Sequence, residues 1–176
     1  ANHKAIRVVD VDSGRVRTLL NGAAEPTPDH IYDIHNGLAW SRFDGTILFN
    51  SQVEGYGYDQ DVLRLDPGTS AVTAVTDLWG DEDFFVALSP SPKGSRIAAV
   101  MVDPGSPTRW HICLINGMVI LPVSQPTAEQ MNNPRWFPDG RRLLYSSGPP
   151  AGQRLFGIPA TSGEPTALTE TGADSS

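Results

Sequence analysis

Short runs of apolar residues along this chain alternate with polar residues, and glycine, proline, asparagine or aspartate interrupts them every few positions. Alternation with a period of two predicts half-buried β-strands, and the interruptions predict the turns between them. The 176 residues include 17 glycines and 15 prolines, which leaves room only for short elements. Neither residues 25–34 nor residues 127–132 show more than a single helical turn, so we expect an all-β fold with these segments as loops.

A hairpin unit recurs three times. In residues 133–147 a strand ends at Trp136, a Pro-Asp-Gly turn follows, and a second strand leaves the turn. Residues 37–51 repeat this unit and residues 86–100 are a degraded copy, with turn glycines 49 and 46 residues apart. Pro presets one backbone angle of such a turn and Gly supplies another, so a hairpin is expected in each copy.

The apolar residue before each turn is expected to be equivalent in the three copies, which aligns Trp40, Leu88 and Trp136. The turn glycine follows at five, six and four residues, a variation that predicts insertions in some turns. Because Trp40 and Trp136 recur periodically, we interpret both as core residues.

A second hairpin follows each unit, in residues 61–76, 110–123 and 154–169, and residues 6–20 match this second hairpin alone. The turn glycines Gly14, Gly68, Gly117 and Gly163 are 54, 49 and 46 residues apart. Internal similarity at a period near 50 residues indicates a repeat architecture, here of two, four, four and four strands.

The run from Trp136 to Gly140, the aliphatic strand up to Ser147, and the later Ala167-Leu168-Thr169 resemble the TolB-type, WD40-like β-propeller repeat. The resemblance implies one four-stranded blade per repeat, with the strand before the Asp-Gly turn innermost. The fold expected is therefore an all-β segment, residues 1–176, of about three and a half antiparallel blades. The half blade is residues 5–22, and the blades are about residues 36–78, 84–124 and 132–170.

Blades of a propeller protect their edges and faces by closing a ring. Three and a half blades do not close one, so we expect this chain to be part of a longer propeller. The alternative is a chain that closes a ring with copies of itself or with another chain.

The formal net charge is −7, with acidic residues spread over many turns, which argues against nucleic acid as a partner. No apolar run approaches the roughly 18 residues that suggest a membrane span. Cys113 is expected to be a buried thiol, and one cysteine does not identify the compartment. The resemblance to TolB favours a periplasmic or other extracytoplasmic location.

Catalytic and metal motifs are missing from the sequence. Gly-x-Ser-x-Gly, which presents the serine of many hydrolases, does not occur. The four histidines lack the spacings that converge on one ion, so neither a metal nor another cofactor is expected. His111 is expected to be half exposed on a strand. Of the pair Asp10 and Asp12, we expect Asp12 to bond the amides of a hairpin turn rather than to bind calcium.

Three loop segments are candidate binding sites. The first enters the first complete blade, where loops can face a central channel; the second is an acidic loop at one end of the ring; the third is a glycine-rich connection with exposed tyrosines. The alternatives without a binding role are loop side chains that are hydrogen-bonded to the backbone and an acidic loop that only contacts solvent. The candidate residues are His30, Asp33 and His35; Asp81, Glu82 and Asp83; and Tyr56 and Tyr58.

The function expected is a non-catalytic protein- or peptide-binding or scaffold module of the TolB-like type. Its partner would be a protein, a peptide or the rest of its own propeller. The alternative is the propeller portion of an enzyme, such as a prolyl-oligopeptidase-like peptidase or a propeller polysaccharide lyase, in which loops gate or position substrate. A fold shared by many functions does not choose between them.

Overall fold

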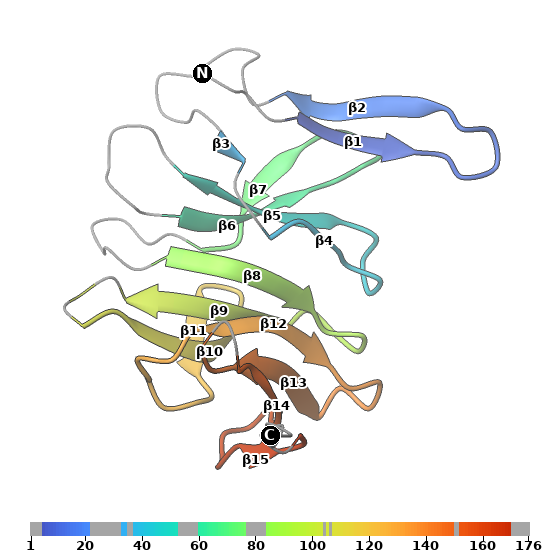
Figure 1. Ribbon diagram of the computed structural model, residues 1–176. Helices are drawn as coiled ribbons and strands as arrows, with labels where there is room; N and C mark the ends of the chain where they lie inside the picture. The colour runs from blue at the N-terminus through green and yellow to red at the C-terminus, as the bar shows by residue number, and fades with distance from the viewer. Residues whose placement is uncertain are drawn as a thin grey trace.

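The computed structural model describes residues 5–21, 33–34, 37–52, 60–76, 84–103, 105, 107–149 and 152–169, and every helix or strand in these ranges is a β-strand (Figure 1). The described residues form one strand more than the fourteen expected, because the first strand of the first complete blade is split in two. The strands are β1 (Ala5–Val9), β2 (Val16–Asn21), β3 (Asp33–Ile34), β4 (Ala39–Trp40), β5 (Ile47–Gln52), β6 (Gln60–Leu65), β7 (Val72–Ala74), β8 (Phe84–Pro90), β9 (Ile97–Asp103), β10 (Arg109–Asn116), β11 (Val119–Pro122), β12 (Met131–Trp136), β13 (Arg142–Ser147), β14 (Arg154–Pro159) and β15 (Thr166–Ala167).

The strands form antiparallel units in chain order. β1 and β2 form a two-stranded sheet; β3 and β4 share the edge of β5, which pairs with β6 and then β7; β8 to β11 and β12 to β15 are four-stranded units. One parallel bridge, between Gln60 and Phe84, joins the first complete blade to the second. This arrangement confirms the fold class, a propeller segment of a half blade and three complete blades.

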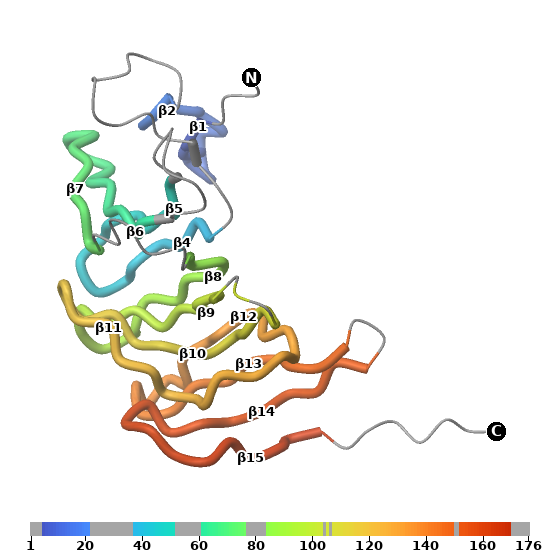
Figure 2. The backbone as a smooth tube through the Cα atoms, turned by 90° about the vertical axis from the view of Figure 1, so that its left-hand side faces the viewer, coloured from blue at the N-terminus to red at the C-terminus, as the bar shows by residue number. Residues whose placement is uncertain are grey.

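Each blade packs face to face on the next, as the turned view in Figure 2 shows. The half blade contributes Ile6 and Leu19 to a cluster with Phe49 of the first complete blade. Two further apolar clusters lie between the complete blades, and both are built from strands of two successive blades. The core is therefore divided into one apolar layer for each blade boundary, as expected of a repeat architecture.

The three inner hairpins have the same length. Trp40 pairs with Ile47, Pro90 with Ile97 and Trp136 with Leu143, so the paired residues lie seven positions apart in every copy. The counterpart of the two tryptophans is therefore Pro90, and the alignment on Leu88 is wrong. The prediction of inserted turn residues is also wrong, because it is the glycine that moves within a turn of constant length.

The outer hairpins also correct the sequence alignment. Gly14 N donates to Asp10 O, and Ser70 N donates to Asp66 O, each at 2.8 Å. Gly14 and Ser70 both have positive φ, 68° and 61°, so Ser70 rather than Gly68 is the counterpart of Gly14. Asp10, not Asp12, binds the turn: its Oδ1 accepts hydrogen bonds from Ser13 N at 2.8 Å and from Ser13 Oγ at 2.6 Å. These bonds lower the pKa of Asp10.

In each complete blade, a side-chain hydroxyl accepts a hydrogen bond from a backbone amide of the third strand. Val62 N donates to Thr76 Oγ1 at 2.9 Å, and Ile112 N donates to Ser124 Oγ at 2.9 Å. In the last blade the same bond joins Leu155 N to the hydroxyl of Thr169 at 3.0 Å. The side chain stands in for a backbone carbonyl at the irregular end of the strand pair, where the amide would otherwise lack an acceptor.

Single residues test several expectations. Cys113 is fully buried, which confirms the expected thiol environment, and burial raises its pKa to about 12. His111 is buried rather than half exposed, and burial lowers its pKa. Trp136 is half-buried and packs on the core, whereas Trp40 is 52% exposed, so the interpretation of Trp40 as a core residue is wrong. The described residues include no helix long and apolar enough to cross a membrane.

Candidate functional site

The three loop segments singled out from the sequence lie almost wholly outside the described residues. Asp33 alone is described, as backbone: it belongs to β3 and is the strand partner of Gln52. The proposed roles of these segments therefore stay predictions. The candidate residues outside the described ranges are His30, His35, Tyr56, Tyr58, Asp81, Glu82 and Asp83.

A cavity of about 820 Å³ lies along the innermost strands of the three complete blades. Its lining comes from residues 37–40 and 42 at β4, residues 86–92 at β8, and four residues of the β12 hairpin. β4 and β12 each pair with one strand only in the described part of the chain, so these inner strands present a backbone edge. The cavity thus combines backbone polar groups with side chains from three repeats.

The charge of this cavity is opposite to that of the whole chain. Its charged side chains are Arg42 and Arg135, and no Asp or Glu is among the described residues that line it. Both arginines are exposed, and Arg135 Nη1 donates a hydrogen bond to Pro134 O at 3.1 Å. In a chain of net charge −7, this inner cavity is therefore a local positive site.

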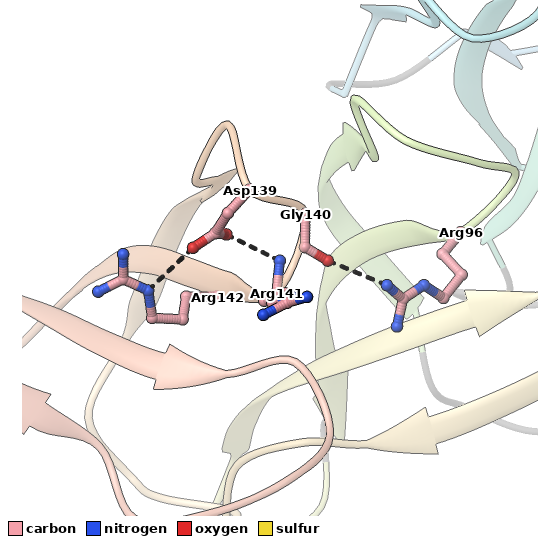
Figure 3. Close-up of polar contacts among 5 residues, drawn as sticks. All are labelled: Arg96, Asp139, Gly140, Arg141 and Arg142. Carbon is pink, nitrogen blue, oxygen red and sulfur yellow. Dashed lines mark hydrogen bonds and ion pairs between the residues drawn. The ribbon is translucent and has the colours of Figure 1, made fainter.

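The boundary between β8 and β12 fixes one wall of the cavity. The indole Nε1 of Trp136 donates a hydrogen bond to Ser89 O at 2.8 Å. The guanidinium of Arg96 lies 5.1 Å from the centroid of the Trp136 ring, a cation–π distance. Arg96 also donates to Gly140 O at 3.1 Å, so both inner hairpins are tied together (Figure 3).

The Asp-Gly turn beside this boundary is braced from within. Asp139 Oδ1 accepts a hydrogen bond from Arg141 N at 2.8 Å, and Asp139 Oδ2 lies 3.3 Å from Arg142 Nε (Figure 3). The backbone hydrogen bond from Arg141, with the nearby Arg142 side chain, lowers the pKa of Asp139. The Asp139 carboxylate is therefore engaged within its own turn, and it is not among the residues that line the inner cavity.

The chemistry that the cavity offers is recognition by hydrogen bonds, positive charge and apolar contact. Its serines, Ser89 and Ser91, are buried, and Ser91 Oγ accepts a hydrogen bond from Lys93 N at 3.2 Å. No His, Cys or carboxylate is among its described lining residues, so neither serine has a neighbouring base there. Across the described residues, no group of three His, Cys, Asp or Glu side chains is placed to hold a metal ion.

The two arginines were not singled out as site residues from the sequence, because they lie far apart along the chain. Arg42 and Arg135 are 93 positions apart, and the fold brings both to one cavity. A signal was available: each lies within two residues of the tryptophan that ends an inner strand, in the first and last copies of the same hairpin. The two arginines hold different positions of the repeat, but both lie near the end of an inner strand.

Comparisons with known proteins identify the fold. No protein-family model and no curated protein matches the sequence. TolB from Acinetobacter baumannii has a TM-score of 0.64 at 15% identity, over 99% of this chain and 40% of that chain. A protein from Agrobacterium tumefaciens assigned to TolB has a TM-score of 0.68 at 16% identity, over 94% and 56%. A prolyl endopeptidase has a TM-score of 0.61 at 15% identity, over 92% and 25%. The chain thus spans about half or less of each solved structure.

Proposed function

We propose that this chain, whose fold is that of a TolB-like β-propeller, is a non-catalytic binding module for an extended acidic segment of a protein or peptide. The observation that carries the proposal is the inner cavity of about 820 Å³ with Arg42, Arg135 and no described carboxylate in its lining. Its size lies within the range of about 300–1,000 Å³ usual for binding pockets.

The shape of the site favours an extended ligand. Residues 86–92 form a continuous stretch of the lining, and β12 presents an inner edge that pairs with no strand in the described part of the chain. A peptide in extended conformation can add main-chain hydrogen bonds to such edges, while its side chains meet the pockets between the blades. Arginine is suited to carboxylates, because its planar guanidinium can donate two parallel hydrogen bonds to one carboxylate.

A second role has one observation in its favour, the similarity of fold to a prolyl endopeptidase. In that case this segment would gate or position a substrate for a catalytic unit encoded outside residues 1–176. The sequence contains no Gly-x-Ser-x-Gly of its own. In both roles the inner cavity binds a peptide. The roles differ only in whether a catalytic unit outside residues 1–176 then acts on that peptide.

Fluorescence anisotropy tests the proposed function. A labelled peptide rich in glutamate and aromatic residues is titrated with the 176-residue chain at low and at high ionic strength, beside a peptide with lysine in place of glutamate. We expect saturable binding of the acidic peptide that weakens at high salt, because exposed charges are screened, and much weaker binding of the basic peptide. Equal binding of the two peptides would remove the basis of the proposal.

A further inference from the structure

A second cavity, here called the turn cavity, lies where turns of the last two blades meet. Its volume is about 600 Å³, and it is lined by Arg96, residues 139–142 and residues 159–161. Arg96 immediately precedes β9, residues 139–141 belong to the β12–β13 turn, and residues 159–161 include the end of β14. The turn cavity shares no described lining residue with the inner cavity, so it is a separate candidate site.

The lining of the turn cavity is strongly cationic. Its charged groups among the described residues are three arginines and one carboxylate, Asp139. Three positive charges and one negative charge leave the lining at +2, in a chain of net charge −7. Asp139 is already engaged, since its Oδ2 lies 3.3 Å from Arg142 Nε and its Oδ1 accepts the hydrogen bond of Arg141 N. The charge that remains for a ligand is therefore that of Arg96 and Arg141.

Two of the three guanidinium groups are held by contacts to rings and backbone. Arg96 Nη2 donates a hydrogen bond to Gly140 O at 3.1 Å, and the Arg96 guanidinium lies 5.1 Å from the centroid of the Trp136 ring. The Arg142 guanidinium lies 4.4 Å from the centroid of the Phe137 ring. Side chains that are already ordered lose less conformational entropy when a ligand binds. The turn cavity thus presents cations in a defined arrangement.

Arg141 differs from the other two arginines. Its side chain is exposed, and its guanidinium makes no hydrogen bond or ion pair with the described residues. Its backbone, in contrast, is used on both sides: Arg141 N donates to Asp139 Oδ1, and Arg141 O accepts from Ala160 N, each at 2.8 Å. Figure 3 shows Arg141 between Arg142 and Arg96. The turn therefore places a guanidinium without a described partner between two that are held.

The remaining surroundings suit a small anionic molecule. A Cβ on Gly140 would lie 3.4 Å from the Cβ of Lys93, so the exposed Lys93 side chain runs beside the turn and adds a further cation at its margin. Thr161 offers a hydroxyl group, and Pro159 and Ala160 offer apolar surface. A volume of about 600 Å³ is in the range of small-molecule sites, about 300–1,000 Å³.

We propose that the turn cavity binds a phosphate group, either free or carried by a small organic molecule. Arg141 and Arg96 donate hydrogen bonds to its oxygens, because the planar guanidinium fork matches the geometry of phosphate. A phosphate monoester carries a charge of about −1.5 to −2 at neutral pH, close to the opposite of the lining, whereas a carboxylate carries a single charge. Long polyanions do not fit, since the net charge of the chain repels them.

Arginine side-chain NMR tests the proposal on the whole 176-residue chain. The isotope-labelled chain is titrated near neutral pH with glycerol phosphate, inorganic phosphate and acetate at constant ionic strength, and the Arg141 Nε–Hε signal is identified by its loss in Arg141→Lys. We expect saturable shifts of this signal with both phosphates and none with acetate. Tighter binding of glycerol phosphate than of inorganic phosphate assigns the cavity to an organic ester, and the reverse assigns it to the free anion. Equal responses to phosphate and acetate overturn the proposal.

Variants locate the site. Arg141→Gln retains the backbone bonds of residue 141 and should stay folded, but it should weaken phosphate binding about fivefold or more. Arg15→Gln, at an exposed arginine of the half-blade turn, is the matched control and should bind as the parent chain does. The double variant Arg42→Glu, Arg135→Glu alters only the inner cavity and should still bind phosphate, which separates this proposal from the proposed function. Unchanged affinity in Arg141→Gln, or an equal loss in Arg15→Gln or in the double variant, overturns the proposal.

Discussion

Trp136 donates its indole hydrogen to the carbonyl of Ser89, 2.8 Å away across the boundary between the second and third complete blades. The bond joins the last residue of one inner strand to the preceding inner strand, 47 positions earlier. It shows how the tryptophan that ends an inner strand can connect neighbouring blades. Trp40 ends the corresponding strand, but the described part of the chain places no inner strand of a preceding blade beside it.

The two tryptophans should respond differently to the same substitution. Trp136→Ala should lower the free energy of unfolding by about 3 kcal/mol, the low end for large aromatic residues, because the ring is half-buried and its hydrogen bond is lost. Trp40→Ala should cost less than about 1 kcal/mol, because surface residues contribute little. Urea denaturation measures both. Equal losses would show that the Trp40 ring is not exposed in solution.

The side-chain hydroxyl that accepts a hydrogen bond from the third strand of each blade should be necessary where it is buried. Thr76→Val preserves the shape of the side chain but leaves the amide of Val62 without its acceptor, so we expect a loss of about 1–3 kcal/mol. Thr76→Ser retains the hydroxyl and should cost less. If the valine variant unfolds at the same urea concentration as the parent chain, the hydrogen bond contributes nothing to stability.

Acid should remove the contribution of the Asp44 carboxylate to the stability of the fold. Burial alone would raise its pKa, but hydrogen bonds from Ser41 and Thr46 and the charge of Arg64, 3.5 Å away, outweigh burial and lower it. A carboxyl group with a lowered folded-state pKa stabilises the fold above its unfolded pKa of about 3.9, and this stabilisation is lost as pH falls through the folded-state value.

Asp44→Asn should accordingly be less stable than the parent chain at pH 7 and equally stable at strongly acidic pH. Denaturation curves across that interval measure the difference. A deficit that is the same at every pH would mean that the side-chain shape, rather than the charge, is responsible.

Cys113 should report unfolding. An ordinary thiol is partly ionised at mildly alkaline pH, but burial raises the pKa of Cys113 to about 12, so its reactive thiolate is scarce in the native chain. Alkylation by iodoacetamide, followed by mass spectrometry, should be slow in the native state and fast in urea. Rapid labelling of the native chain would contradict the packing of Cys113 between the first and second complete blades.

The repeat could be predicted from the sequence because turn residues and strand alternation are local properties. The fold class follows from Gly45, Gly94 and Gly140 and from the paired hairpins after them. Residue equivalence within the repeat could not be predicted in the same way. Pro90 is the counterpart of Trp136, although the two residue types differ. Ser70 adopts the positive φ that was expected of a glycine. In both cases hydrogen bonds rather than residue type define the position.

The candidate site depended on contacts between repeats, which no local pattern contains. Arg42 and Arg135 line one cavity only because their blades pack around a common inner edge. Trp40 and Trp136 carry the same local signal, yet among the described residues only Trp136 has the inner hairpin of a preceding blade beside it. Burial of a repeated residue is thus a property of its neighbour as well as of its own sequence.

Charge reversal of the inner cavity is the most direct test of the central claim that this propeller segment binds an acidic peptide at Arg42 and Arg135. The measurement is the dissociation constant of the labelled acidic peptide for the double variant Arg42→Glu, Arg135→Glu. We predict a loss of affinity of at least tenfold, since each tenfold step corresponds to about 1.4 kcal/mol, and a gain of affinity for the basic peptide. Arg15→Glu, at an exposed arginine of the half-blade turn, should leave binding nearly unchanged. Unaltered affinity in the double variant, or an equal loss in Arg15→Glu, would contradict the account.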